Sequence, residues 1–278
     1  YANIRPSRSL PGVKALYDGV DLVIVRENNE GMQPDRNMYR GGEFMPTPDV
    51  ALSTRVITRR GSERIARTAF EIARGRGAAR RGLEQQHPCG DRPRVTIIHK
   101  RSVFKLTCGL FADTAMAVAG EFPDVDVDDC HVDSFAMHLA MKPQKFDTIV
   151  VTNMFGDILS DLAAGLVGGL GLAPGLNVGE RYAMAQATHG SAPDIAGRNI
   201  ANPYAIIMSG QMLLAWLARR HSDKAASVAA QKIEHAVHAT LAQGGTSTPD
   251  IGGHLTATEF GRAVVRRILT TAPEFRFS

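Results

Sequence analysis

The fold is decided by residues 148–161, TIVVTNMFGDILSD. The β-branched run 148–151 predicts a short buried strand, and this strand leads directly into a helix from about Gly156. On that helix Asp157 and Asp161 lie one turn apart on one face, with Cβ atoms about 5–6 Å apart. Because two like charges there repel each other, the spacing indicates a hard divalent cation, Mg²⁺ or Mn²⁺, which prefers carboxylate oxygens. Two solvated surface acids are the alternative.

The same alternation of strands and helices runs outward from this segment. Strands are expected at residues 20–25 and 95–98, which are short apolar runs. Helices are expected over 110–119 and from Ser62, as the capping residue, to about Ala73. Strands that alternate with helices predict an α/β fold, in which ligand sites gather at the carboxyl ends of the strands.

The composition of the sequence changes after Gly168, where a Gly- and Pro-rich stretch begins. Helices are expected over 205–218 and 222–242, and a last helix follows the capping-box spacing of Thr256 and Glu259. These helices need a sheet to pack on, and the residues after Gly168 supply few strands. We therefore expect an N-terminal segment to be missing before Tyr1.

The composition is that of an ordinary globular protein, with 278 residues, 44% hydrophobic and 22% charged. No apolar run approaches eighteen residues, which argues against a membrane span, and the start does not resemble a signal peptide. The three cysteines have no metal-ligand spacing, so we expect neither zinc nor disulfides. A reducing, cytoplasmic location fits them best.

Basic residues concentrate between Arg55 and Lys105, where fourteen Lys or Arg accompany four Asp or Glu, although the net charge is only +4. One interpretation is a nucleic-acid footprint. The other is an exposed helix face followed by a basic loop over residues 74–94. The loop lacks interleaved aromatic residues, so we expect no nucleic-acid partner.

A loop of small residues and prolines covers residues 188–203. Small residues allow the backbone to approach a ligand closely. An acid such as Asp194 can accept a hydrogen bond from a ribose 2′-hydroxyl and would repel a 2′-phosphate, which favours NAD over NADP. No G-x-G-x-x-G fingerprint occurs, so an ordinary Rossmann domain is not supported. A purely structural loop is the alternative.

Three basic residues end or follow hydrophobic stretches. Arg5 and Arg26 present forks that suit carboxylates, although surface arginines would look the same. Lys100 follows the strand 95–98, which is a good place for a general base. The histidines of this region are expected to be packing or surface residues rather than ligands; they are His99, His131 and His138.

Taken together, the motifs resemble those of the β-decarboxylating dehydrogenases, the family of isopropylmalate, isocitrate, homoisocitrate and tartrate dehydrogenases. The resemblance covers essentially the whole chain and rests on YANIRP at 1–6, VIVREN at 23–28, His99-Lys100, Val132-Asp133, residues 153–161 and the loop 189–203. It implies an isopropylmalate dehydrogenase-like two-domain fold with the active site in the interdomain cleft. The smaller, dimer-forming domain would be 1–167, and 168–278 would be part of the larger, NAD-binding domain.

The resemblance also implies roles for individual residues. Arg5 and Arg26 would bind the substrate carboxylates, while Asp157, Asp161 and Asp133 would hold Mg²⁺ or Mn²⁺. Lys100 and Asp133 would be catalytic and would come from the partner subunit of a homodimer with shared active sites. The residues that would contact NAD are His189, Gly190, Ser191, Ala192, Asp194, Ile195 and Asn202. The substrate would be a small 2-hydroxy dicarboxylic acid, and the sequence does not say which.

Three positions depart from the family pattern. Gln33 stands where the family has a proton-donating tyrosine, Ser102 replaces an asparagine, and Gln186 replaces a glutamate. One hypothesis is an active dehydrogenase, with Tyr39 or water supplying the proton. The other is a degenerate binding or regulatory subunit of the same fold.

Overall fold

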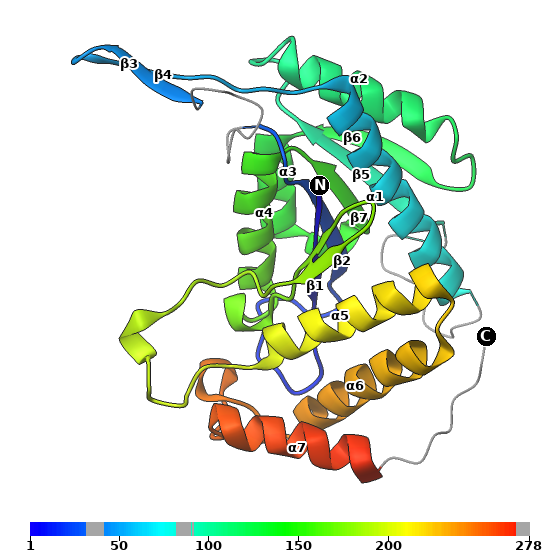
Figure 1. Cartoon of the computed structure of the whole chain (residues 1–278), viewed down its shortest axis with the longest axis vertical. Helices are drawn as coiled ribbons and strands as arrows, with labels where there is room; N and C mark the ends of the chain where they lie inside the picture. Colours follow the sequence, from blue (N-terminus) through cyan, green and yellow to red (C-terminus); the bar gives the residue numbers. More distant parts are fainter. Residues whose placement is uncertain (32–41, 82–89, 91, 271–278) are drawn as a thin grey trace. The chain divides into compact units, whose positions relative to one another are not determined.

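In a computed structural model the chain divides into two compact units, each described by itself (Figure 1). The structure describes residues 1–31, 42–81, 90 and 92–270. The first unit contains residues 1–5 and 19–163, and the second contains residues 6–18 and 164–278. The domain boundary expected after residue 167 stays a prediction.

The first unit is built on a sheet in which four of the five strands run parallel. Its strands are β1 (Ala2–Arg8), β2 (Asp21–Glu27), β5 (Arg94–His99), β6 (Asp126–His131) and β7 (Thr148–Val151). They follow the order β6-β5-β7-β2-β1, and the pairs β2–β7, β5–β7 and β5–β6 are parallel. The helices are α1 (Arg59–Arg80), α2 (Thr107–Ala119), α3 (Val132–Met141) and α4 (Asn153–Leu166), with a 3₁₀ turn at Pro143–Lys145. Because the paired strands run the same way, their carboxyl ends share one edge.

Helices cover both faces of this sheet, as the buried residues show. On one face α1 and α2 pack against the strands, with Phe70, Phe111 and Ile97 almost fully buried in one cluster. On the opposite face, where α3 and α4 lie, Leu22 and Ile149 are also fully buried. This burial on both faces explains the short, continuous apolar strands of the sequence and confirms the predicted α/β fold.

The amino edge of the sheet carries a closed ionic cluster, the amino-edge cluster, formed by Asp21, Arg76, Arg80 and Asp147. Asp147 is fully buried, and its Oδ1 accepts from Arg76 Nε at 2.8 Å and from Arg80 Nη2 at 2.6 Å. The backbone N–H of Arg94 donates to its Oδ2 at 3.1 Å. The cluster ties the last turns of α1 to the start of β2 and β7.

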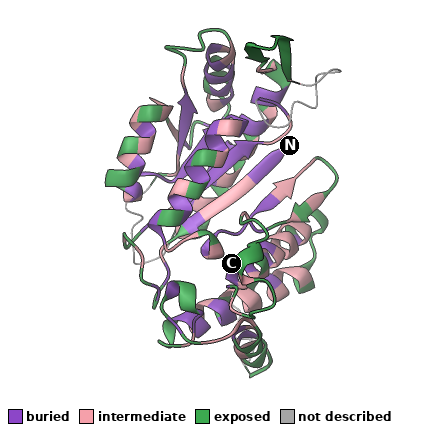
Figure 2. Cartoon of the chain, turned by 90° about the vertical axis from the view of Figure 1, so that its left-hand side faces the viewer, coloured by how far each residue is buried: buried purple, intermediate pink, exposed green. Residues whose placement is uncertain are grey.

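Two further strands, β3 (Glu43–Thr47) and β4 (Val50–Ser53), form an antiparallel hairpin that projects from the first unit. Every residue of both strands is exposed, as Figure 2 shows. The exposed residues include four large apolar side chains, Phe44, Met45, Val50 and Leu52. A two-stranded hairpin alone is marginally stable in water, and none of the residues of these two strands is buried in the chain.

The second unit is mainly helical. Its elements are β8 (Leu176–Val178), β9 (Ala183–Ala185), α5 (Tyr204–His221), α6 (Lys224–Ala242) and α7 (Ala257–Thr270), with 3₁₀ turns at Leu170–Leu172, Pro193–Ile195 and Pro249–Ile251. The strands β8 and β9 pair antiparallel. The buried cluster of this unit includes Met208 from α5, Val237 and Leu241 from α6 and Phe260 from α7.

Helix ends test the capping predictions. The expected capping box is present, because Thr256 N donates to Glu259 Oε2 at 2.8 Å and Glu259 N donates to Thr256 Oγ1 at 3.3 Å. The expected cap at Ser62 is wrong. Thr58 caps α1 instead, accepting from Gly61 N at 3.0 Å, so the helix begins a turn earlier than the pattern indicated.

Within the described residues, no helix combines the length and hydrophobicity that a membrane crossing requires. Several arginines of the basic stretch pair with acids of the first unit. Arg67 binds Glu121 through two hydrogen bonds of 2.6 and 2.8 Å, and Arg74 binds Asp124 similarly.

Candidate active site

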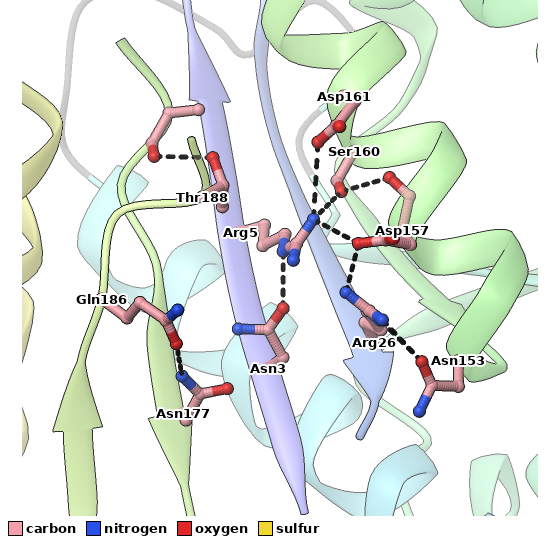
Figure 3. Close-up of polar contacts among 11 residues, drawn as sticks. Asn3, Arg5, Arg26, Asn153, Asp157, Ser160, Asp161, Asn177, Gln186 and Thr188 are labelled. Atoms are coloured by element: carbon pink, nitrogen blue, oxygen red, sulfur yellow. Dashed lines mark hydrogen bonds and ion pairs between the residues drawn. The ribbon is translucent and has the colours of Figure 1, made fainter. Parts of the chain in front are cut away.

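The carboxyl edge of the first unit's sheet brings together four charged residues predicted from the sequence. Arg5 on β1, Arg26 on β2, and Asp157 and Asp161 on α4 form the carboxyl-edge cluster (Figure 3). Strand β7 ends at Val151, so α4 starts immediately above this edge. The i, i+4 spacing expected from the sequence therefore puts both acids beside the arginines.

Arg26 lies almost buried between the end of β2 and the first turn of α4. Its Nη2 and Nε donate to Asn153 Oδ1 at 2.6 and 3.1 Å, and its Nη1 donates to Asp157 Oδ1. Asn153 itself is fully buried at the first position of α4. The Asn153 amide thus fixes the plane of the Arg26 guanidinium, while the Asp157 carboxylate binds its Nη1.

Arg5 reaches the same acids from the neighbouring strand. Its Nη1 lies 3.1 Å from Asp157 Oδ1, 3.5 Å from Asp161 Oδ1 and 2.6 Å from Ser160 Oγ. Its Nε donates to Asn3 Oδ1 at 2.5 Å. Asn3 and Arg5 are two positions apart on β1, so their side chains lie on one face of the strand, and Asn3 helps to orient Arg5.

The charges of the carboxyl-edge cluster are incompletely compensated. Burial, and then the charge of Arg5, lower the pKa of Arg26. Burial raises the pKa of Asp161, and this effect exceeds the opposing influence of the Arg5 charge, while the charge of Asp157 raises the pKa further. Because both ions are disfavoured, an additional anion beside the arginines and an additional cation beside the acids would both be stabilising.

The side chain of Arg26 passes over Gly156, where only a hydrogen fits. A Cβ at position 156 would lie 2.7 Å from Arg26 Cγ, 2.9 Å from Arg26 Cβ and 2.9 Å from Val151 Cγ1. The glycine in the sequence 153–161 is therefore required by this close approach rather than by its backbone angles.

Lys100 and Asp133 form a second pair at the same edge, after β5 and β6. Lys100 Nζ donates to Asp133 Oδ1 at 2.6 Å, and this bond lowers the pKa of the carboxyl. The lysine side chain is 23% exposed and that of Asp133 is 63% exposed. The structure thus brings together the lysine and the acid that the sequence predicted as catalytic partners.

The donor set of the acids fits a hard divalent ion in type but is incomplete in one chain. Asp157 and Asp161 offer only carboxylate oxygens, which suit Mg²⁺ or Mn²⁺. Among the residues that the structure describes, no group of three or more His, Cys, Asp or Glu side chains could hold a metal ion. Asp133 therefore does not complete a three-acid site with Asp157 and Asp161 inside the described chain.

The predicted NAD loop lies in the second unit and is largely exposed. His189, Gly190, Ser191, Ala192 and Asp194 are all exposed, and Ile195 is half-buried. A short 3₁₀ turn holds residues 193–195.

The backbone of this loop is unusual at one alanine. Ala192 adopts a left-handed conformation with φ 44°, which is uncommon for a residue with a Cβ. His189 Nδ1 lies 2.9 Å from Gly190 O, so local contacts shape this part of the loop. Such strain is found in ligand-binding segments, where the surrounding structure maintains it.

The loop is anchored at its carboxyl end by Asn202. This buried residue donates from Nδ2 to Asp250 Oδ2 at 3.0 Å, and its Oδ1 accepts from Tyr204 N at the start of α5. The structure therefore gives Asn202 a positioning contact that the sequence did not indicate, while leaving Asp194 exposed.

The three departures from the family pattern have different outcomes. Gln33, and Tyr39 with it, lie outside the described residues. Ser102 Oγ lies 3.5 Å from His131 Nδ1 beside Lys100. Gln186 Oε1 accepts from Asn177 Nδ2 at 3.3 Å across the β8–β9 pair, as Figure 3 shows.

Sequence reasoning missed two buried acids beside Arg26. Glu27 accepts from the N–H groups of Asn29 and Glu30, and burial raises its pKa. Glu30 accepts from Thr58 N and Oγ1, both at 2.8 Å, and so holds the loop after β2 against the start of α1. The position of these two acids, directly after an apolar strand, could have indicated that they are buried.

Comparison with known proteins points in one direction. A family model described as isocitrate/isopropylmalate dehydrogenase matches residues 1–264. The 3-isopropylmalate dehydrogenase of Archaeoglobus fulgidus is 47% identical over 264 residues, which are 95% of this chain and 72% of that protein. The isocitrate/homoisocitrate dehydrogenase of Thermus thermophilus is 47% identical over 96% of this chain and 71% of that protein.

Two further matches extend the comparison to structure and to the type of subunit. A crystal structure of isocitrate dehydrogenase from Methylococcus capsulatus superposes with a TM-score of 0.82 at 42% identity, covering 96% of this chain and 73% of that one. A mitochondrial protein of Dictyostelium discoideum, named as a regulatory subunit of NAD isocitrate dehydrogenase, is 40% identical over 96% of this chain and 68% of that protein.

Proposed function

Because the chain belongs to the isocitrate/isopropylmalate dehydrogenase family of oxidoreductases, we propose that it oxidises and decarboxylates a 2-hydroxy dicarboxylic acid of the 3-isopropylmalate or isocitrate type to a 2-keto acid. The observation that carries this proposal is the carboxyl-edge cluster, in which buried arginines face half-exposed acids. Arg5 and Arg26 are 12% and 8% exposed, whereas Asp157 and Asp161 are 37% and 52% exposed.

The arginines would bind the substrate carboxylates. The pKa of Arg26 is lowered by burial and by Arg5, so a carboxylate placed beside both guanidiniums would relieve their repulsion. Asn153 keeps the guanidinium of Arg26 oriented, because its Oδ1 accepts hydrogen bonds from both Nη2 and Nε. Each hydrogen bond between such charged groups contributes about 1.5–3 kcal/mol.

The acids would hold the divalent ion together with Asp133 of a second chain. This division is compatible with the lack of a three-acid group in the described part of one chain. When bound, Mg²⁺ or Mn²⁺ would supply Lewis-acid polarisation of the substrate's hydroxyl and carboxylate oxygens. A fully ionised Asp161 is needed for this, and binding should therefore strengthen as the pH rises above its raised pKa.

Lys100 would act as the general base. Its Nζ would accept the proton of the 2-hydroxyl group, and the Asp133 carboxylate, which lies 2.6 Å away, keeps Nζ at the edge of the sheet. The hydride from C2 would go to the nicotinamide of NAD, and the resulting β-keto acid would lose CO₂. A proton donor would then be required for the enolate, and Gln33 cannot supply one near neutral pH.

NAD is proposed as the cofactor on two grounds. Asp194 is exposed on a loop whose small residues leave room for a ligand, and it would repel the 2′-phosphate of NADP. The Dictyostelium relative carries NAD in its name. His189, Gly190, Ser191, Ala192 and Ile195 would line the adenosine half, with Asn202 anchoring the loop.

A homodimer with shared active sites is the proposed assembly. The β3–β4 hairpin exposes Phe44, Met45, Val50 and Leu52, a surface that a second copy of the chain would cover. Replacing Phe44 and Leu52 by Asp should shift the sedimentation coefficient from dimer to monomer. An unchanged dimer would place the interface elsewhere.

The cellular setting is proposed from smaller observations. Cys108 and Cys130 are free thiols, which suits the reducing cytoplasm. Several arginines of the basic stretch are paired with acids, as Arg67 is with Glu121. We therefore propose a small-molecule substrate without a nucleic-acid partner.

A regulatory or ligand-binding subunit is the second candidate function. It is favoured by Ser102 and Gln186, which replace family residues, and by the relative named as a regulatory subunit. Replacing Gln33 by Tyr separates the candidates, because a gain in turnover would identify position 33 as a weakened proton-donor site.

The decisive experiment is NADH formation by the protein with Mn²⁺ and each of isopropylmalate, isocitrate, homoisocitrate and tartrate. Chelator-sensitive turnover of one of them would support the enzyme and supply its substrate. Absence of turnover with all four, while NAD still binds, would support the regulatory subunit instead.

A further inference from the structure

A second polar pair lies next to Lys100, on the strands β5 and β6 that precede Lys100 and Asp133. His99 is the last residue of β5, and its ring Nε2 lies 2.7 Å from Asp129 Oδ2 on β6. The strands are in parallel register, with Ile97 beside Asp129 and His99 beside His131. The ring of His99 also packs edge-to-face on that of His131, with centroids 5.1 Å apart.

Both ring nitrogens of His99 are engaged although its side chain is only 1% exposed. Nδ1 accepts a hydrogen bond from the backbone N–H of Arg101 at 3.3 Å. Since Nδ1 is the acceptor, the ring proton of the neutral imidazole lies on Nε2 and is donated to Asp129. Asp129 therefore selects the tautomer that lets Nδ1 serve the backbone.

The bond to Arg101 holds one side of the Lys100–Arg101 peptide. The other side is held as well, because the Lys100 carbonyl accepts from Val103 N at 3.1 Å and from Phe104 N at 2.9 Å. The N–H and C=O of one peptide lie in one plane, so these bonds fix the orientation of that plane. The direction in which the Lys100 side chain leaves the backbone is thereby fixed.

We propose that His99, oriented by Asp129, is a positioning residue for Lys100. It acts through the peptide that carries the lysine, by the hydrogen bond that its Nδ1 accepts from Arg101 N–H. The inference rests on the proposed function, in which Lys100 is the general base. The histidine that the sequence suggested as mere packing therefore has a defined role in aiming the base.

Two near-isosteric substitutions separate the two bonds of the ring. His99→Asn keeps an oxygen near the position of Nδ1, so it can still accept from Arg101 N–H. His99→Gln places its amide near Nε2, so it can reach Asp129 but leaves the Arg101 N–H without its acceptor. Both variants are uncharged and polar, and both remove the ring from the same buried space.

The expected result is a difference between the variants in kcat rather than in KM. A displacement of about 1 Å costs about 100-fold in rate, so His99→Gln should lose turnover by about that factor while His99→Asn stays within about tenfold of the wild type. The KM for the substrate, which Arg5 and Arg26 bind, should be unchanged in both. His138→Asn on α3 is the matched control and should behave as the wild type.

A parallel test leaves the histidine in place. Asp129 is half-exposed on β6, so both Asn and Leu are tolerated there. Asp129→Asn still accepts from Nε2–H and should preserve kcat. Asp129→Leu removes the acceptor and should lower kcat about tenfold, a smaller loss because the ring stays packed against His131.

Three results would overturn the inference. One is equal kcat for His99→Asn and His99→Gln at equal melting temperature. Another is a rise in KM that accounts for the whole loss. The third is equal kcat for the two Asp129 variants, which remains measurable if the His99 variants do not fold. An inactive wild type would instead refute the proposed function, so the two failures are distinguishable.

Discussion

Each of the two edges of the first unit's sheet carries a cluster of arginines and aspartates, and the clusters differ in how far the aspartates are exposed. In the amino-edge cluster the acid Asp147 is fully buried, while Arg76 and Arg80 cover it at 18% and 16% exposure. In the carboxyl-edge cluster Arg26 is buried and Arg5 is 12% exposed, whereas the acids Asp157 and Asp161 are 37% and 52% exposed. The first arrangement is closed, whereas the second leaves its acids open to a cation from solution.

The pKa directions agree with this contrast. Burial opposes ionisation of Asp147, yet the bonds and charges of Arg80 and Arg76 outweigh it and lower its pKa. At the other edge the pKa of Asp161 is raised and that of Arg26 is lowered. An ion cluster that stabilises its own charges is structural, and one that does not is ready to bind a ligand.

The largest expected effect is on catalysis, from Asp157→Asn. Loss of the carboxylate proposed to bind the metal should remove about 4 kcal/mol of transition-state stabilisation, or about a thousandfold in kcat/KM. The free energy of unfolding should fall less than in Asp147→Ala, because the acid is 37% exposed and the asparagine oxygen can still accept a hydrogen bond from Arg26. Steady-state kinetics with Mn²⁺ and a thermal melt measure both quantities. If Asp157→Asn instead unfolds, and its folded fraction turns over substrate as the wild type does, Asp157 is a structural residue. The proposed difference between the two edges would then be wrong.

Next in size is the opposite change at the amino edge, Asp147→Ala. Two arginines would lose their buried partner, and the free energy of unfolding should fall by about 3 kcal/mol. Turnover per folded molecule should be unaltered. Urea denaturation gives the stability, and Asp124→Ala, whose partner Arg74 is exposed, is the control that should melt as the wild type does.

A matched pair of arginine substitutions sharpens the comparison further. Arg26→Lys loses the fork that binds Asn153 and Asp157, and KM for the substrate should rise about tenfold, since one charged hydrogen bond contributes about 1.5 kcal/mol. Arg76→Lys should instead lower the free energy of unfolding by about 1.5 kcal/mol with KM unchanged. The assignment of one cluster to binding and the other to stability would be contradicted if Arg26→Lys lowered only the free energy of unfolding and Arg76→Lys raised only KM.

The smallest effect is the pH dependence of stability. The lowered pKa of Asp147 stabilises the fold above the unfolded value of about 3.9, and this contribution is lost as the pH falls through the folded pKa. The raised pKa of Asp161 acts oppositely, since stability declines as the pH rises from the unfolded to the folded value. Urea titrations of Asp147→Asn and Asp161→Asn between about pH 2 and 6 should show slopes changed in opposite directions.

Local pattern predicted the elements that form the sheet and the acids above it. The strand expected at 148–151 is present with those bounds, and the helix after it begins at Asn153, slightly earlier than expected. Periodicity and i, i+4 spacing are properties of a few neighbouring residues, so Asp157 and Asp161 could be paired from the sequence alone.

Contacts between distant residues could not be predicted in this way. Nothing in the basic run indicated that Arg76 would be buried against Asp147, seventy-one positions away. The cap of α1 was missed for the same reason, because Glu30 holds Thr58 from another part of the chain. His99 looked like a packing residue because its partner Asp129 lies on the next strand.

The missing side chain at Gly156 has a consequence for how this protein tolerates mutation. A single methyl group there would press on the Cβ and Cγ of Arg26 and turn its guanidinium away from Asn153. In a survey of all substitutions, position 156 would score as intolerant as the residues that perform the chemistry. A position without any functional group would thus be counted among the functional ones, for reasons of space alone.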